Sequence, residues 1–155
     1  MLRISKLADY GTVVMVYLAK HACTLCNARD IARQTHLALP TVSKLLKRLT
    51  AAGLLSSVRG AAGGYRLQRL AKDISVTEII YALDDDRGLT ECSLQPNDCA
   101  LQHVCHVQGN WKLISQSIVA ALDSVSLEAL ASPVLSAVEL EQMKQIALKT
   151  GVRRG

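Results

Sequence analysis

Apolar residues recur every three or four positions in four segments of the first half of the chain, a spacing typical of amphipathic helices. The pattern predicts helices over 5–20, 28–35, 39–52 and 75–83. The third segment begins with Leu39 and Pro40, and proline suits a first helical turn because it lacks the N–H that this turn leaves unpaired. Gly53 suits the left-handed position that follows the last turn of the same helix.

Between the third and fourth helices the pattern changes to that of a β-hairpin. Strands are predicted over 54–59 and 65–70, with Gly60, Gly63 and Gly64 in the short connection between them. A short helix, a turn, a basic helix and a hairpin with a glycine-rich tip together make a winged helix-turn-helix. We therefore expect a mainly α fold with a two-stranded β-wing.

The second half of the chain contains one long helical pattern, over 111–131. Its apolar stripe consists of Trp111, Ile114, Ile118, Leu122 and Val125. A long helix that extends beyond a small domain often packs against its symmetry mate, so we expect a homodimer formed through this helix. Pro133 interrupts the pattern, and a weaker amphipathic helix is predicted over 136–149, followed by a frayed tail.

These elements divide the 155 residues into four parts. We expect a winged helix-turn-helix domain over 1–83, a cysteine-rich loop over 84–110, a dimerisation helix over 111–131, and a C-terminal helix and tail over 132–155. The longest apolar run is too short to span a bilayer, and the N-terminus lacks the pattern of a secretory signal. We therefore expect a cytoplasmic protein without a membrane partner.

Charge is distributed unequally along the chain. Residues 1–70 carry 11 Lys and Arg against 2 acidic residues, a balance of +9, whereas residues 71–155 carry 7 against 11, a balance of −4. A basic N-terminal half is the electrostatic signature of a protein that binds a polyanion. Together with the winged helix-turn-helix pattern, it predicts binding to double-stranded DNA.

The candidate DNA contacts lie at the start of the third helix and on the wing. A helix fits the major groove of B-DNA, and the residues of its first turns reach the base edges. An arginine at a wing tip can enter the neighbouring minor groove. The glycines of the wing could simply make a turn, but a turn does not explain the flanking arginines. The predicted contact residues are Pro40, Thr41, Val42, Ser43, Lys44, Lys47, Arg59, Gly60, Gly63 and Arg66.

Three of the five cysteines, Cys92, Cys99 and Cys105, lie within fourteen residues. An odd number of cysteines in a reducing compartment argues against a disulfide framework and favours metal or redox chemistry. The three thiolates could hold an iron–sulfur cluster, or zinc with His103 or His106 as the fourth ligand. Cys23 and Cys26 provide only two ligands, and two small apolar residues in a turn explain them as well.

Three segments resemble a known family. They are MLRISKLADY at 1–10, SKLLKRL at 43–49 and SVRGAAGGYRL at 57–67. They are similar to the Rrf-two (IscR/NsrR-like) family of bacterial winged helix-turn-helix transcription regulators, over about residues 1–131. The stretches at 89–92 and 109–111 most resemble the branch that regulates the SUF iron–sulfur assembly system. The resemblance implies a homodimer on a palindromic operator, and a cluster that tunes repression or activation of iron–sulfur assembly genes.

The resemblance also implies that Cys92, Cys99 and Cys105 ligate the cluster, and it leaves the fourth ligand open. IscR-like members place a histidine three residues after the last cysteine, where this chain has Gln108, and His106 is the nearby substitute. NsrR-like members use an aspartate of the first helix, supplied across the dimer, and Asp9 matches that position. Asp9 could equally cap the helix or pair with a basic side chain. A 2Fe–2S cluster is preferred to a 4Fe–4S cluster.

Two alternatives belong to other functional classes. The first is a winged-helix regulator that holds zinc or no metal and responds to another ligand. The second is a small iron–sulfur redox protein, which explains neither the basic half nor the wing. No pairing of a nucleophile with a base is apparent in the sequence, so we do not expect an enzyme or a small-molecule substrate.

Overall fold

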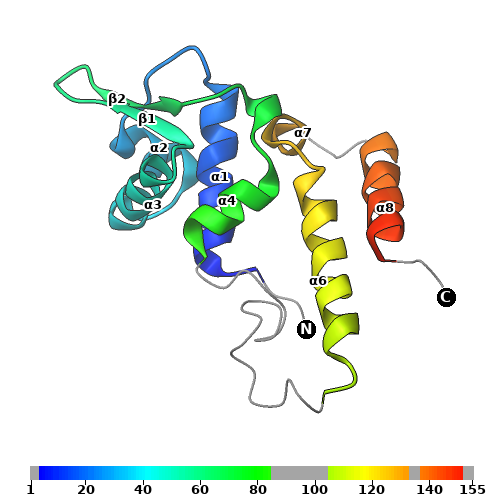
Figure 1. Ribbon diagram of the computed structural model, residues 1–155. Helices are drawn as coiled ribbons and strands as arrows, with labels where there is room; N and C mark the ends of the chain where they lie inside the picture. The colour runs from blue at the N-terminus through cyan, green and yellow to red at the C-terminus, as the bar shows by residue number, and fades with distance from the viewer. Residues whose placement is uncertain (1–3, 85–104, 133–136, 152–155) are drawn as a thin grey trace.

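The computed structural model describes residues 4–84, 105–132 and 137–151, and it has the expected mainly α architecture with a winged helix-turn-helix (Figure 1). The first part contains helices α1 (Lys6–Lys20), α2 (Ala28–Thr35), α3 (Leu39–Ala51) and α4 (Val76–Leu83). Strands β1 (Leu55–Val58) and β2 (Gly64–Leu67) and a short 3-10 helix, η1 (Ala71–Asp73), lie between α3 and α4. Helices α6 (Gln108–Asp123), α7 (Leu127–Ala131) and α8 (Ala137–Gly151) follow.

Local side-chain signals explain where these helices begin and end. The Ser5 hydroxyl accepts the N–H of Ala8 at the start of α1, and the Asn27 amide oxygen accepts the N–H of Asp30 at the start of α2. Such caps satisfy backbone donors that the first turn leaves unpaired. Helix α3 begins with Pro40 in its first turn, and Gly53, just after its end, has a φ of 75°. The four helices predicted in the first half are therefore confirmed.

Helix α1 lies at the centre of the core. Its inward face packs against α2, α3, α4 and α7. Gly11 lies at the contact between α1 and α4, where an added Cβ would collide with the side chain of Leu83. Leu127 of α7 is fully buried, so the α7 segment is part of the same core. The fully buried side chains are aliphatic ones and Met15, as expected for a chain without phenylalanine: Val14, Leu18, Ile31, Val42, Leu45, Leu46, Leu49, Ile74, Ile79, Leu83 and Leu127.

The wing is a two-stranded antiparallel sheet in which Leu55 pairs with Leu67 and Val58 with Gly64. The loop between α1 and α2 adds a bridge to this sheet: the N–H of Cys26 donates to the carbonyl of Tyr65 over 3.0 Å, and the N–H of Tyr65 donates back over 2.9 Å. Both strands are shorter than the predicted ranges 54–59 and 65–70. Strand β1 lacks Leu54 and Arg59, and β2 begins one residue earlier than predicted, at Gly64, and ends at Leu67, because Gln68 and Arg69 form a bend.

The predicted single helix over 111–131 is wrong in its bounds, because two helices separated by a break occupy this region. Helix α6 starts three residues earlier than expected and ends at Asp123, and α7 starts anew at Leu127 with Ser126 as its cap. Backbone pairing with the chain before α4 causes the break. The N–H of Val76 donates to the carbonyl of Val125 over 2.9 Å, and the N–H of Leu127 donates to Ile74 over 2.8 Å.

The C-terminal helix predicted over 136–149 corresponds to α8, which packs alongside α6 (Figure 1). Around the start of α6, an apolar face remains exposed in the single chain. It consists of Val107, Trp111, Leu113 and Ile114, each between 42% and 51% exposed. Within the described ranges, none of the helices combines the length and the apolar character that crossing a membrane requires.

The packing at Gly11 leads to a stability prediction. Gly11→Ala should lower the free energy of unfolding by about 1–3 kcal/mol, because its Cβ would collide with the side chain of Leu83, which is buried and would have to shift within the core. Gly109→Ala is the matched control, since no heavy atom lies within 4 Å of its added Cβ and alanine favours helix. Urea denaturation followed by circular dichroism measures both. Equal stability of Gly11→Ala and wild type would contradict the packing described for α1 and α4.

Candidate nucleic-acid interface and metal ligands

The first turns of α3 present polar side chains on one face and apolar side chains on the other. Pro40, Ser43, Lys44 and Lys47 are exposed, and Thr41 is partly exposed. Val42 is 0% exposed. It belongs to the same inward face as the leucines of α3, so its prediction as a DNA contact is wrong: a side chain enclosed in the core cannot reach a base.

The turn between α2 and α3 sets the direction of α3. His36 closes α2 in the left-handed conformation, with a φ of 56°. On α2 itself, Arg33 is exposed and donates to the carboxylate of Asp30 over 2.9 Å, so this cation is partly neutralised. The exposed lysines of α3 are therefore better placed than Arg33 to meet a polyanion.

The wing carries two exposed arginines, Arg59 beside the tip and Arg66 on β2. The Nε of Arg66 donates across the hairpin to the Ser56 hydroxyl over 3.4 Å. Gly60 has a φ of 116°, and an added Cβ at Gly63 would collide with the carbonyl oxygen of Val58. Turn geometry thus accounts for both glycines, and their contact with DNA stays a prediction. The wing, α2 and α3 lie on one side of α1, with α6 and α8 on the other (Figure 1).

The residues that hold β2 against the loop between α1 and α2 were not predicted from the sequence. Gly64 lies against the loop between α1 and α2, where an added Cβ would come within 2.8 Å of the Cys26 carbonyl oxygen. Cys26 is buried and bridges to β2, whereas Cys23 is exposed. Both cysteines thus lie in the short connection between α1 and α2, in agreement with their interpretation as small residues of a turn. No short-range signal marks this bridge, because its partners are far apart in the sequence.

Tyr17 of α1 packs beside this loop. Its ring stacks on His21 with ring centroids 4.3 Å apart. Burial raises the pKa of the Tyr17 phenol, and the Cys26 thiol and the Asp30 carboxylate nearby raise it further. The phenol therefore stays neutral at physiological pH and serves as a packing group beneath the wing.

Only some of the candidate cluster ligands belong to the described residues. Cys92, Cys99 and His103 lie outside them, so the structure gives no account of these three. Cys105 is a half-buried free thiol three residues before α6, and His106 beside it is exposed. Gln108 is the first residue of α6. Among the described residues alone, no three His, Cys, Asp or Glu side chains gather in a group that could hold a metal ion.

Asp9 is exposed in the first turn of α1. It does not cap the helix, since Ser5 does so. The Ser5 hydroxyl also donates to the carboxylate of Asp84 over 2.6 Å, and Asp84 is the last described residue before the cysteine segment. The described residue before the cysteine segment, Asp84, is thus bonded to the cap of α1, one helical turn before Asp9, and the described residue after it, Cys105, lies just before α6.

A basic helix and a basic wing on one side of a helical core define a winged-helix nucleic-acid-binding protein. Comparison with known proteins specifies the family. Residues 4–133 match the family model of Rrf2, described as an iron-dependent transcriptional regulator. The chain therefore belongs to the Rrf2 family, whose members are DNA-binding transcription regulators and not enzymes.

Individual relatives agree with this assignment. The transcriptional regulator IscR of Photorhabdus laumondii is 32% identical over 130 residues, which cover 83% of this chain and 79% of that protein. NsrR of Bacillus subtilis is 26% identical over 146 residues, covering 93% of this chain and all of that protein. The solved structure of CymR, the global cysteine regulator of B. subtilis, superimposes with a TM-score of 0.68 and 32% identity, covering 86% of this chain and 99% of CymR.

The contact between Gly64 and Cys26 gives a second prediction. Gly64→Ala should separate β2 from the loop between α1 and α2 and lower both the melting temperature and the affinity for DNA. Ala62→Ser, on the exposed wing tip, is the control and should change the melting temperature little. Thermal unfolding and fluorescence-anisotropy titration measure the two effects. A Gly64→Ala variant with wild-type stability and affinity would show that the bridge does not hold the wing.

Proposed function

We propose that this protein is a transcription regulator whose DNA binding responds to an iron–sulfur cluster held by Cys92, Cys99 and Cys105. The observation that carries the proposal is the attachment of the cysteine segment. It begins beside the first turn of α1 and ends at the start of α6. A change in what the segment binds therefore acts on the central helix and on α6 together. The family description, an iron-dependent regulator, supports iron as the metal.

The described residues that could complete the site fit iron–sulfur ligation chemically. Thiolates are the usual ligands of such clusters, and Cys105 supplies a thiol that is free and only half-buried. Asp9 and His106 are both exposed and so accessible as the fourth ligand. Asp9 would be supplied across the dimer, by the second copy of the chain. When bound, the cluster would supply a charge and a ligation state that change with iron supply or oxidation, and we favour the 2Fe–2S form.

On DNA, two copies of the chain would each present α3 and the wing to one half of a palindromic operator. Thr41, Ser43 and Lys44 would face base edges in the major groove, and Arg59 would enter the minor groove. Lys47 and Arg66 would contact phosphates. The exposed apolar face of Val107, Trp111, Leu113 and Ile114 supports pairing of two copies through α6. Such a regulator would act in the cytoplasm, and genes for iron–sulfur assembly of the SUF type are the proposed targets.

DNA binding by the basic face should depend steeply on salt. With six to eight phosphate contacts per dimer, a plot of log affinity against log salt should have a slope of roughly −5 to −7. Arg59→Ala should weaken binding about 5- to 100-fold, the equivalent of one good groove contact. Lys47→Ala should reduce the steepness of the slope by about one.

Lys149→Ala, on the distant helix α8, is the matched control and should bind like wild type. The assay is an anisotropy titration at several salt concentrations, with a duplex that the wild-type protein has selected from a random-sequence pool. Wild-type affinity and slope in both the Arg59 and Lys47 variants would refute this interface.

Protein purified without oxygen should be coloured and contain iron and acid-labile sulfide. Cys99→Ala should lose colour and iron yet keep the melting temperature of the metal-free wild type, because the buried side chains described over 4–84 and at Leu127 pack on one another as a core. Cys23→Ala is the control and should keep the cluster, since Cys23 is exposed in the loop between α1 and α2 and is not a predicted ligand.

The three arms of the metal analysis separate the hypotheses. Iron with sulfide supports the proposal. Zinc without iron would replace the proposed cluster by a Cys3His zinc site that includes His103 or His106. Absence of both metals would favour the alternative of a regulator that responds to another ligand. Cluster content without DNA binding at low salt would point instead to a redox protein.

A further inference from the structure

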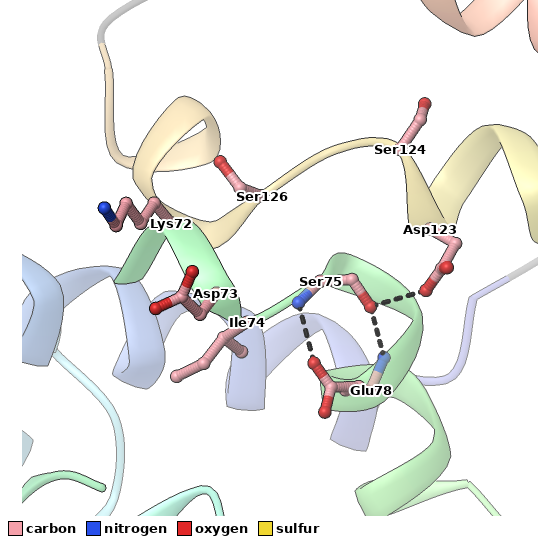
Figure 2. A pocket seen from close by; sticks show the side chains of 8 residues that line it. All are labelled: Lys72, Asp73, Ile74, Ser75, Glu78, Asp123, Ser124 and Ser126. Atoms are coloured by element: carbon pink, nitrogen blue, oxygen red, sulfur yellow. Dashed lines mark hydrogen bonds between the residues drawn. The ribbon is translucent and has the colours of Figure 1, made fainter. Parts of the chain in front are cut away.

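A polar junction joins the start of α4 to the end of α6 (Figure 2). Ser75 lies at its centre. The Ser75 hydroxyl accepts the N–H of Glu78 over 3.2 Å and donates to the carboxylate of Asp123 over 2.7 Å. The N–H of Ser75 donates to the Glu78 carboxylate over 2.9 Å. One serine therefore caps α4 and also holds the last residue of α6.

The junction continues to the wing through Arg69. This residue follows β2 by two positions, and its guanidinium donates to the second carboxylate oxygen of Glu78 over 2.5 Å and to the Asp73 carbonyl over 3.0 Å. Partial burial acts to raise the pKa of Glu78, but the hydrogen bonds from Arg69 and from the Ser75 N–H outweigh it and lower the pKa. Glu78 is therefore ionised at neutral pH, and a continuous set of hydrogen bonds runs from Arg69, two residues after β2, to the end of α6.

Asp123 is an unusual residue for its position. A carboxylate at the C-terminus of a helix faces the negative end of the helix dipole, which disfavours it. Helix α6 would thus form at least as well without this side chain, and the hydrogen bond to Ser75 is the contact that Asp123 adds. The neighbouring backbone pairs of Val76 with Val125 and of Leu127 with Ile74 need no particular side chain, so Asp123 is the replaceable part of the junction.

From this geometry we infer that Asp123 is a positioning residue that couples α6 to the wing through Ser75, Glu78 and Arg69. A displacement of the end of α6 pulls on Ser75, which holds both the start of α4 and the Glu78 carboxylate that Arg69 binds. The inference rests on the proposed function, in which α6 carries the regulatory signal. Because coupling between two sites is reciprocal, DNA bound at the wing must also stabilise the end of α6.

The experiment uses this reciprocity, so that it does not depend on the cluster. Amide hydrogen exchange of the full chain is measured with and without the duplex selected from a random-sequence pool. In the wild-type protein, DNA should slow exchange at residues 120–127 severalfold. Asp123→Ala should lose this slowing while still binding the duplex, and Asp123→Asn, which keeps an acceptor oxygen, should retain it. Glu141→Ala removes an exposed carboxylate from α8 and is the matched control.

Asp123→Lys separates coupling from folding. It cannot accept the Ser75 hydrogen bond, yet a cation favours the C-terminus of a helix, so α6 stays formed. It should behave like Asp123→Ala. Equal DNA-dependent slowing in wild type, Asp123→Ala and Asp123→Lys would overturn the inference, and so would the absence of slowing in the wild type.

The affinity ratio between cluster-loaded and cluster-free protein provides a second measurement. We expect Asp123→Ala to reduce this ratio to less than about a third of the wild-type ratio, itself expected between about 5 and 150. A wild-type protein that holds no iron would refute the proposed function alone, because the exchange measurement still decides whether Asp123 couples the wing to α6.

Discussion

The burial of α1 is the constraint on which the rest of the structure depends. This helix contacts α2, α3, α4, α7 and β2, and at Gly11 it has no room for a side chain beside Leu83 of α4. Its two ends lie beside different functional parts. Ser5 at the N-terminal end holds Asp84, where the cysteine segment begins. The loop after the C-terminal end holds β2 through the bridge between Cys26 and Tyr65. Helix α1 therefore separates Asp84, the last described residue before the cysteine segment, from the bridge that holds the wing.

The same packing explains why α6 does not stand apart from the winged-helix domain. The chain after α6 pairs with residues 74–76 and then places Leu127 in the core. The end of α6 is thereby anchored within the DNA-binding half, while its start, next to Cys105, has exposed apolar side chains. An anchored end and an exposed start suit a helix that a bound group or a second copy could reorient.

Much of the fold follows from short-range sequence signals, and the errors arise where distant segments interact. Helix limits near Ser5, Pro40, Gly53 and Ser75 are set by caps and backbone preferences that a few neighbouring residues determine. The break between α6 and α7 is not visible locally, because it results from pairing with a segment about fifty residues earlier.

Among the candidate site residues, the exposed cations of α3 and the wing follow from charge and periodicity. Position in the first turns of α3 predicts Val42 as a contact, whereas the apolar periodicity of the same helix places it on the buried face, where the structure has it. The roles of Gly64 and Cys26 depend on contact between residues nearly forty positions apart, which composition and spacing do not reveal. Cys92 and Cys99 are known as candidate ligands only from the sequence, since they lie outside the described residues.

The exposed face at the start of α6 affects how operator occupancy depends on the number of protein molecules in the cell. Water-exposed Trp111 and Ile114 favour association, because burying apolar surface is the main driving force for protein contacts. If a second copy covers them, assembly is governed by mass action, and occupancy of a two-part operator rises more steeply than in proportion to the number of molecules in the cell. Synthesis rate and dilution by growth would then tune the gene response together with the bound metal.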